Sequence, residues 1–479
     1  MLKQKAKAAV LWSGADIFLR QGLQFGISII LARLLSPEEF GTIALLYLFT
    51  GLASVFVDGG FSTALIQRQD INQTDESTVF WFNLSVGFIV ALGMWAIAPA
   101  IAKFFKQPVL APLAGLMAIN VILSAFGSIH GTLLTKKLDF RTQMKAGGIA
   151  TAISGGAAIV MAWHGLGVWA LAVQTVVATL FTTVLLWKLN SWRPDYEFSM
   201  TSVRKLFGFG GYILASGLLD ITYNRLYTLL IGKLYGVQEL GFYSRAEGTK
   251  QLPVGVLTAV LSRVAFPVFS AAISDIDQLR RGVQLSVRVM MLVNVPMMLV
   301  LMAIAEPLIQ ILFGDQWLPA VPILQILCFA GVFWPLHVIN LNVLMAQGHS
   351  SLFFRLEVLK KILGIGALAV GAFYGVMGIA WSQVVFGVFA FFINAFYTGR
   401  HIGYGALSQI QDFYLVFILS FLFFAFGIPT LTSLFHEKWI ALMVSVPAVT
   451  GLFFLTAWLL RVPGIGEVGK IIKLDKKNA

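Results

Sequence analysis

The sequence predicts an all-α, polytopic membrane protein with about fourteen transmembrane helices in two pseudo-symmetric six-helix lobes plus two extra C-terminal helices. Of its 479 residues, 58% are hydrophobic and only 12% are charged, and the mean hydropathy is +0.84. A soluble globular chain carries about twice that charged fraction. The apolar residues also fall in long runs, and one ten-residue turn occurs twice. Together these observations exclude a soluble fold.

Each apolar run is long enough to cross a hydrocarbon layer, which takes about 20 helical residues. The expected helices lie at 9–34, 39–66, 77–104, 109–133, 145–163, 166–188, 206–233, 238–270, 282–313, 319–346, 354–374, 377–399, 412–432 and 438–460. The polar residues 191–205 form a cytoplasmic joint. They separate an N-terminal lobe at 1–190 from a C-terminal lobe at 206–400. Residues 401–479 hold the last two helices and a basic tail.

The turn after the first helix is repeated two hundred positions later. Residues 32–41 read ARLLSPEEFG, and residues 232–241 read GKLYGVQELG. Leu, Glu and Gly recur at identical offsets, and Arg33 is matched by Lys233. A related pair begins the sixth and twelfth helices, at 165–170 and 375–380. Because each half holds an even number of helices, the repeats are parallel and are related by an axis along the membrane normal.

Basic loop residues favour one side of the predicted membrane. That side receives most of them, among them Lys188, Arg193, Arg204, Lys205, Arg280, Arg281, Arg355, Lys360, Lys361 and Arg400. The other side receives only Arg33, Lys103, Lys106, Lys233 and Lys438. Cytoplasmic loops carry the excess of Lys and Arg, so we expect both termini in the cytoplasm. Arg288, near a cytoplasmic helix end, can extend its side chain to the headgroups.

Charged residues inside the predicted helices are the candidate site. A charge at the centre of a spanning helix costs roughly 2.5–3.5 kcal/mol even on lenient scales, so it faces a partner or a hydrated cavity. The candidate substrate-binding cations are Arg20, Arg225, Arg245 and Lys250. The candidate cavity or ion-coupling carboxylates are Asp16, Asp58, Asp220 and Glu247.

Two of these cations can also be neutralised on their own helix. Asp16 and Arg20 are four residues apart, and Glu247 and Lys250 are three apart, so each pair shares a helix face. Structural pairing is therefore the alternative to a cavity. If the cations do line a hydrated cavity, its positive potential favours an anionic cargo.

The sequence lacks the motifs of several other functions. It contains no phosphate-binding loop, which excludes an ATPase in this chain. Its six histidines lack metal-ligand spacing, and Cys328 is the single cysteine. Ser202 and Lys205 match a Ser-x-x-Lys pattern without its companion motifs. The basic residues form no soluble patch for nucleic acid. We therefore expect no catalytic residues, metal, cofactor or nucleic-acid partner.

The repeated turn, together with DGGFSTALIQ at 58–67, resembles bacterial polysaccharide exporters. These belong to the multidrug/oligosaccharidyl-lipid/polysaccharide exporter superfamily, and the resemblance is to its colanic-acid and O-antigen flippase (Wzx-type) branch. It covers essentially the whole chain. It implies alternating access in the bacterial inner membrane, with an undecaprenyl-pyrophosphate-linked oligosaccharide moved from the cytoplasmic to the periplasmic leaflet. It also implies a cationic central cavity, onto which the four cations map by helix and depth.

Further expectations concern energy and partners. Coupling to an H⁺ or Na⁺ gradient would use one of the four carboxylates, and the membrane potential can act directly on an anionic cargo. Membrane lipids surround the protein, and the polysaccharide polymerase machinery is a candidate partner.

Two other functions are weighed against the flippase. A multidrug exporter of the same superfamily would need an acidic or apolar cavity, which the buried Arg and Lys residues disfavour. A polysaccharide polymerase or ligase would need sizeable periplasmic loops, and the predicted ones are short.

Overall fold

The computed structural model describes residues 2–68, 70–271 and 275–467, and the described part of the chain is helical without strands. Eleven helical segments there are long and apolar enough to cross a membrane, or up to twelve if a bent pair is one span. The protein is therefore an all-α, polytopic membrane protein. The number of fourteen is compatible with these helices and stays a prediction, since the charged α9 (Val237–Ala271) is not among the eleven.

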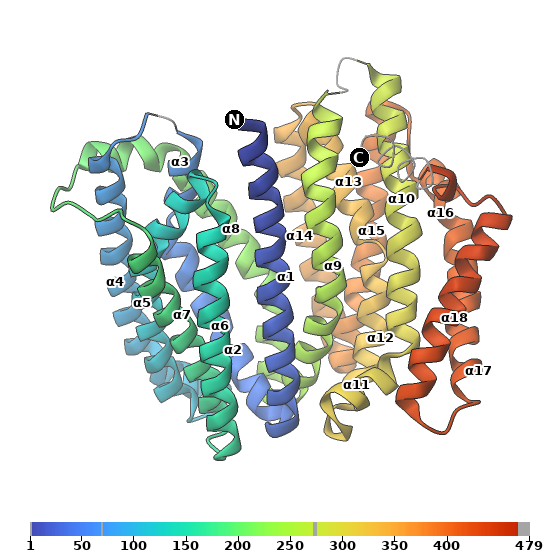
Figure 1. Cartoon of the computed structure of the whole chain (residues 1–479), viewed down its shortest axis with the longest axis horizontal. Coiled ribbons are helices and arrows are strands. Elements are labelled where there is room, and N and C mark those ends of the chain that lie inside the picture. The colour runs from blue at the N-terminus through green and yellow to red at the C-terminus, as the bar shows by residue number, and fades with distance from the viewer. Residues whose placement is uncertain (1, 69, 272–274, 468–479) are drawn as a thin grey trace. The chain divides into compact units, whose positions relative to one another are not determined.

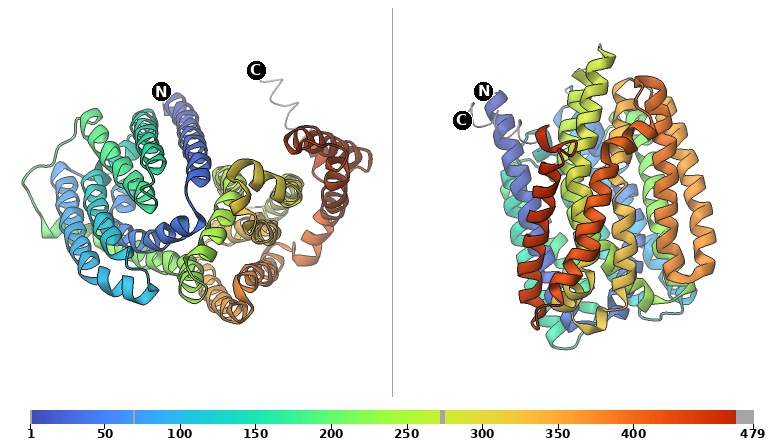
Figure 2. Two further views of the ribbon diagram at one scale, coloured as in Figure 1. Left: turned by 90° about the horizontal axis from the view of Figure 1, so that it is seen from below. Right: turned by 90° about the vertical axis from the view of Figure 1, so that its right-hand side faces the viewer.

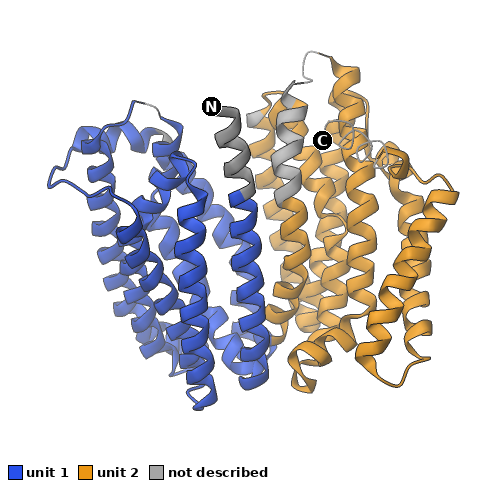
Figure 3. Cartoon of the chain, in the orientation of Figure 1, with its two compact units in different colours: residues 1–241 blue, residues 242–479 orange. Residues whose placement is uncertain are grey.

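Packing divides the chain into two compact units, at residues 1–241 and 242–479 (Figure 3). Unit 1 holds α1 (Leu2–Leu34), α2 (Pro37–Asp58), α3 (Phe61–Gln67), α4 (Gln73–Phe105), α5 (Leu110–Lys136), α6 (Phe140–Trp163), α7 (Val168–Leu189) and α8 (Met200–Leu234). It also holds the first turn of α9. The predicted lobes at 1–190 and 206–400 rest on the repeat rather than on packing, and they stay a prediction.

Unit 2 contains most of α9 and the remaining helices. These are α10 (Ile276–Ala303), α11 (Ala305–Phe313), η1 (Asp315–Trp317), α12 (Ala320–Gly331), α13 (Trp334–Ala346), α14 (Ser350–Gly371), η2 (Ala372–Tyr374), α15 (Gly375–Ile402), α16 (Ala406–Ser420), the π-helix η3 (Phe421–Gly427), α17 (Ile428–Thr432) and α18 (Lys438–Leu459). Within each unit the long helices run side by side in both views (Figures 1 and 2).

Several predicted spans are interrupted. The predicted helix 39–66 is α2 and α3, separated by Gly59 and Gly60, which both adopt left-handed φ angles of 56° and 75°. A Cβ on Gly60 would lie 2.1 Å from the backbone oxygen of Gly210. Glycine is therefore required both by the turn and by the close approach of α8. The predicted helices 282–313 and 319–346 are also divided into shorter helices, without a left-handed glycine at the breaks, and 412–432 contains the π-helix η3.

The repeated turns meet each other inside unit 1. A Cβ on Gly41 would lie 1.6 Å from the backbone oxygen of Val237, and a Cβ on Gly241 would lie 1.9 Å from that of Pro37. Each glycine thus faces the residue that begins the other helix. Side chains cannot fit where two backbones touch, so the repeated glycine has a packing reason. The side chains of Ser36 and Glu39 form a capping box that fixes the start of α2.

The 191–205 joint is firmly held on unit 1. Its backbone forms hydrogen bonds with side chains of α4. Gln73 Nε2 donates to Arg193 O (2.6 Å) and Trp81 Nε1 donates to Asp195 O (2.8 Å). Asp195 N donates to Ser77 Oγ (2.9 Å) and Ser199 N donates to Thr78 Oγ1 (3.1 Å). Trp81 also stacks on Tyr196. After this linker, α8 packs on α2, α3 and α4. The first helix of the second repeat therefore belongs to unit 1 by its contacts.

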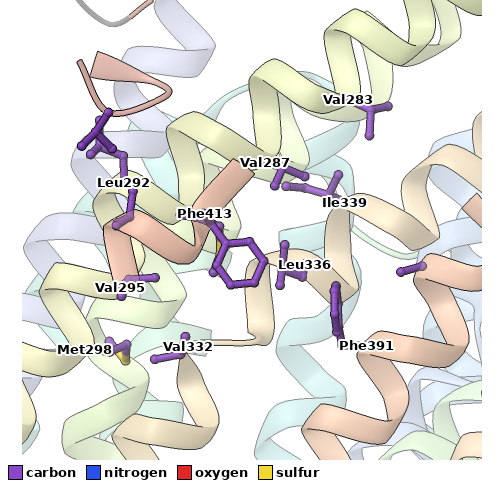
Figure 4. Close-up of a cluster of buried hydrophobic side chains, with 14 of the residues drawn as sticks. Val283, Val287, Leu292, Val295, Met298, Val332, Leu336, Ile339, Phe391 and Phe413 are labelled. Carbon is purple, nitrogen blue, oxygen red and sulfur yellow. The ribbon is translucent and has the colours of Figure 1, made fainter. Parts of the chain in front are cut away.

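Unit 2 is built around an apolar stripe on α10. Val283, Val287, Met291, Val295 and Met298 are fully buried and recur every three or four residues (Figure 4). They pack against apolar residues of α13, α15 and α16, among them Leu336, Phe391 and Phe413. Lipid is as apolar as these side chains, so close packing rather than transfer out of water favours the association.

A polar cluster fastens α16 to α10. Asp412 accepts hydrogen bonds from Arg288 Nε (2.9 Å) and Nη2 (2.7 Å), from Gln284 Nε2 (2.9 Å) and from Tyr404 Oη (2.7 Å). Burial and the neighbouring carboxylate raise the pKa of the Tyr404 phenol, so the phenol keeps the proton that it donates. The extension of Arg288 toward the headgroups stays a prediction, and its guanidinium forms an ion pair with Asp412.

Adding one methyl group tests the contact between the two repeated turns. We expect Gly41→Ala or Gly241→Ala to destabilise the protein by about 1–3 kcal/mol, because the methyl forces two backbones apart. The measurement is the thermal unfolding midpoint of the purified protein in detergent. Gly93→Ala is the control, since a Cβ on Gly93 meets no atom within 4 Å. Equal midpoints for Gly41→Ala and Gly93→Ala would contradict the contact.

Candidate functional site: intramembrane charges

Arg20 is paired on its own helix. Its guanidinium forms an ion pair with Asp16, whose side chain is 5% exposed, while that of Arg20 is 42% exposed. The helix spacing of four residues places both on one face, as the sequence predicts. The guanidinium lies against α6, where a Cβ on Gly147 would be 2.6 Å from Arg20 Cδ. Small residues on α6 thus let α1 approach closely and leave room for this side chain.

Arg225 lies on α8 beside α2. Its Nε is 3.8 Å from the position of a Cβ on Gly51, and its guanidinium is close enough to Tyr47 to interact electrostatically with the phenol. The side chain is partly buried. Among the residues that the structure describes, no carboxylate pairs with it. Arg225 therefore has no local neutralising charge in this part of the chain.

Tyr47 and Thr175 belong to this environment, and sequence reasoning did not find them. Tyr47 Oη and Thr175 Oγ1 are 3.0 Å apart, and Thr175 Oγ1 also donates to Leu171 O at 3.1 Å. A hydroxyl has one hydrogen, so Tyr47 is the donor to Thr175. The lone pairs of Tyr47 Oη then remain as acceptors near Arg225. An uncharged tyrosine and threonine carry no charge signal that would single them out in an apolar helix.

Arg245 and Lys250 lie on α9 in unit 2. The Arg245 guanidinium carbon lies 4.6 Å from the ring centre of Phe313 and 4.9 Å from that of Trp317, so aromatic faces hold the cation. Lys250 Nζ is 2.8 Å from Glu247 Oε2, and its side chain is 10% exposed. The predicted pairing of Glu247 with Lys250 is present.

The four candidate carboxylates differ in their surroundings. Asp16 and Glu247 are in the pairs described above. Asp220 is exposed on α8, and Asp58 is partly buried at the last residue of α2. Arg20 and Arg225 belong to unit 1, whereas Arg245 and Lys250 belong to unit 2. A single cavity that contains all four cations stays a prediction.

A further intramembrane ion pair lies on α14. Lys360 is buried and pairs with Glu357, three residues earlier. On the neighbouring helices, His337 Nδ1 lies 3.4 Å from Asn394 Nδ2. The predicted helix 354–374 contains Lys360, and α14 encloses it in the structure. The three-residue spacing of Glu357 and Lys360 inside a predicted helix was the signal that could have shown the pair.

The described residues give little support for metal-dependent or thiol chemistry. No three His, Cys, Asp or Glu side chains there lie together in a way that could hold a metal ion. The Cys328 thiol is buried in an apolar helix. A bundle of spanning helices that carries charged residues inside the membrane is typical of membrane transporters.

The comparisons with known proteins place the chain within that class. A family model described as polysaccharide biosynthesis protein matches residues 30–322. The chain belongs to this family, and it is a transporter rather than an enzyme.

Three relatives align with most of the chain. The teichuronic acid biosynthesis protein TuaB of Bacillus subtilis is 27% identical over 85% of this chain and 86% of its own length. The succinoglycan biosynthesis transport protein ExoT of Rhizobium meliloti is 28% identical, over 76% and 74%. The lipopolysaccharide biosynthesis protein WzxC of Escherichia coli is 25% identical, over 82% and 81%. Their similarity confirms the predicted family.

Two solved structures share the fold. The lipid II flippase MurJ in an inward closed conformation has a TM-score of 0.74 at 16% identity, covering 94% of this chain and 99% of its own. An inward-facing multidrug resistance transporter of the MATE family has a TM-score of 0.62 at 16% identity, covering 82% and 98%. At this identity the likeness concerns the fold alone.

The position of Arg20 can be tested through α6. We expect Gly147→Ala to lower polysaccharide export several-fold, because its methyl would displace the Arg20 side chain from its place beside Asp16. Export is measured as surface polysaccharide per cell at equal membrane protein. Gly156→Ala on the same helix meets no atom within 4 Å and should be neutral. Wild-type export in Gly147→Ala would mean that the placement of Arg20 does not matter.

Proposed function

We propose that the protein is a flippase that moves undecaprenyl-pyrophosphate-linked oligosaccharide units from the cytoplasmic to the periplasmic leaflet of the bacterial inner membrane. Family membership supports this proposal. Relatives are named for teichuronic acid, succinoglycan and lipopolysaccharide biosynthesis, and one structural neighbour is a lipid II flippase. The orientation with both termini in the cytoplasm follows from the charge asymmetry of the loops.

The observation that carries the proposal is the environment of Arg225. A permanent cation in a spanning helix is unfavourable by a few kcal/mol unless a partner or water surrounds it. The phenol of Tyr47 lies near Arg225, and no carboxylate among the described residues forms an ion pair with it. A phosphate or pyrophosphate can supply the missing charge, and guanidinium binds such groups with two parallel hydrogen bonds. A cationic drug would gain nothing at this position.

The other cations contribute in different ways. The Arg245 guanidinium lies over the rings of Phe313 and Trp317, whose faces attract a cation. Arg20 and Lys250 are paired with carboxylates, so an anion must compete with Asp16 or Glu247 for them. Arg225 is therefore the primary anion-binding residue in this proposal, and Arg245, Arg20 and Lys250 are secondary.

Transport then proceeds by alternating access and draws on the membrane potential. A group of charge z crossing 100 mV changes its energy by about 2.3z kcal/mol, so an outward-moving pyrophosphate is driven by an inside-negative potential. A proton or sodium gradient would act through a carboxylate. Asp58 is the carboxylate we propose for this role, because it is partly buried and has no ion-pair or hydrogen-bond partner among the described residues.

Substitution of Arg225 tests the proposed anion site. We expect Arg225→Ala to reduce polysaccharide export at least tenfold and Arg225→Lys to restore part of it, since lysine keeps the charge but loses the bidentate geometry. Arg355→Gln, an exposed arginine on α14, serves as the control. Lipid-linked oligosaccharide should accumulate on the cytoplasmic face in the Arg225→Ala strain. Unchanged export with lost drug resistance would favour a multidrug exporter instead.

The driving force is tested in liposomes. With the potential clamped at zero and ion gradients held constant, we expect flipping of the lipid-linked oligosaccharide to slow several-fold, because the electrical contribution is removed. The part of the rate that then depends on a proton or sodium gradient should disappear in Asp58→Asn. Rates that are indifferent to the potential would refute the electrical contribution, and a gradient response retained in Asp58→Asn would refute the role of Asp58.

A further inference from the structure

A surface groove lies where α15 ends and α16 begins in unit 2. Its volume is about 690 Å³, within the range of ligand sites. Phe392 and Phe396 line it on α15, and Leu407 and Ser408 line it on α16. Phe396 is 63% exposed and Leu407 is 76% exposed. The groove therefore presents apolar walls that no side chain of the described chain covers fully.

Small residues make the groove possible. A Cβ on Gly399 would lie 2.8 Å from Gly405 Cα, so the turn between the helices folds tightly onto α15. The turn passes through Gly403 at a φ of 67°. With no side chains at Gly399 and Gly405, the space beside the aromatic walls stays open. This geometry is local to unit 2.

The rim of the groove is positively charged. Arg400 lines it, is exposed, and has no ion-pair partner among the residues that the structure describes. Arg280 reaches the same turn, with its Nη1 3.6 Å from the position of a Cβ on Gly403. The tilted rings of His401, the residue after Arg400, and His349 have their centres 4.4 Å apart. The neighbouring carboxylate, Asp412, is already bound by Arg288.

A simpler explanation covers only part of this arrangement. Arg400 stands in the last turn of α15, where a cation is favourable next to the negative end of the helix dipole. That accounts for a basic residue at this position. It does not account for an apolar groove of ligand size directly beside it, or for a second arginine at the same turn.

We propose that this groove binds one anionic phospholipid, with an acyl chain along Phe392 and Phe396 and the phosphate at Arg400. The groove lies at helix ends that the loop charges assign to the cytoplasmic side, so the walls adjoin hydrocarbon while Arg400 is at headgroup level. Basic pockets between helices at this depth bind anionic headgroups. A free phosphate would leave the apolar walls unused. The site does not depend on the proposed transport function.

The test counts bound lipids. Full-length protein in a neutral detergent is titrated with phosphatidylglycerol or with phosphatidylcholine of identical acyl chains, and complexes are resolved by native mass spectrometry. We expect one phosphatidylglycerol to bind more tightly than phosphatidylcholine. Arg400→Gln should weaken that binding about fivefold, the effect of one surface arginine. Ser408→Phe, which fills the groove, should weaken the binding of both lipids.

The matched control is Arg355→Gln. Arg355 is an exposed arginine near the N-terminal end of α14, and this variant should bind phosphatidylglycerol like the wild type. Equal affinity of the wild type for the two lipids would overturn the proposal. So would equal losses in Arg400→Gln and Arg355→Gln, or displacement of the lipid by inorganic phosphate at the same concentration. Thermal unfolding of each variant, compared with the wild type, verifies that a lost lipid reflects the site rather than misfolding.

Discussion

The neutralisation of charge inside the helix bundle is the constraint on which the rest of the structure depends. Three cations are neutralised by a carboxylate on their own helix, in the pairs Asp16–Arg20, Glu247–Lys250 and Glu357–Lys360. Partners three or four residues apart stay together however a helix moves, so these charges remain compensated throughout a transport cycle. Arg225 is the exception in unit 1. No carboxylate among the described residues pairs with it, which is why we propose it as an anion-binding residue.

Helix positions and same-helix charge pairs could be predicted from the sequence, because both are local. An apolar run of spanning length must be helical in lipid, and a spacing of three or four residues fixes which side chains share a face. Contacts between distant segments could not be predicted in this way. Gly60 meets Gly210, Arg288 meets Asp412, and Tyr47 meets Thr175 only once the chain is folded. The broken helices and the unforeseen neighbours of Arg225 have this common origin.

The internal repeat gains a physical meaning from the structure. Gly41 and Gly241 stand at equivalent places in the two copies, and each touches the backbone of the residue that starts the other helix. Fusing two copies of a gene would bring both glycines to the same contact at once. Divergence elsewhere in the two copies is free to alter side chains, whereas these two positions are held by backbone geometry.

The anchoring of residues 191–205 on α4 affects how the protein can be divided into two polypeptides. The sequence suggests a cut in this polar segment, but such a cut would leave α8 on the fragment that lacks α2, α3 and α4, the surfaces against which it packs. The turn at Gly236, between α8 and α9, keeps α8 with those surfaces. In co-expressed fragments divided there, α8 stays with its packing surfaces, and the contacts of Gly41 with Val237 and of Gly241 with Pro37 are formed between the two fragments and join them.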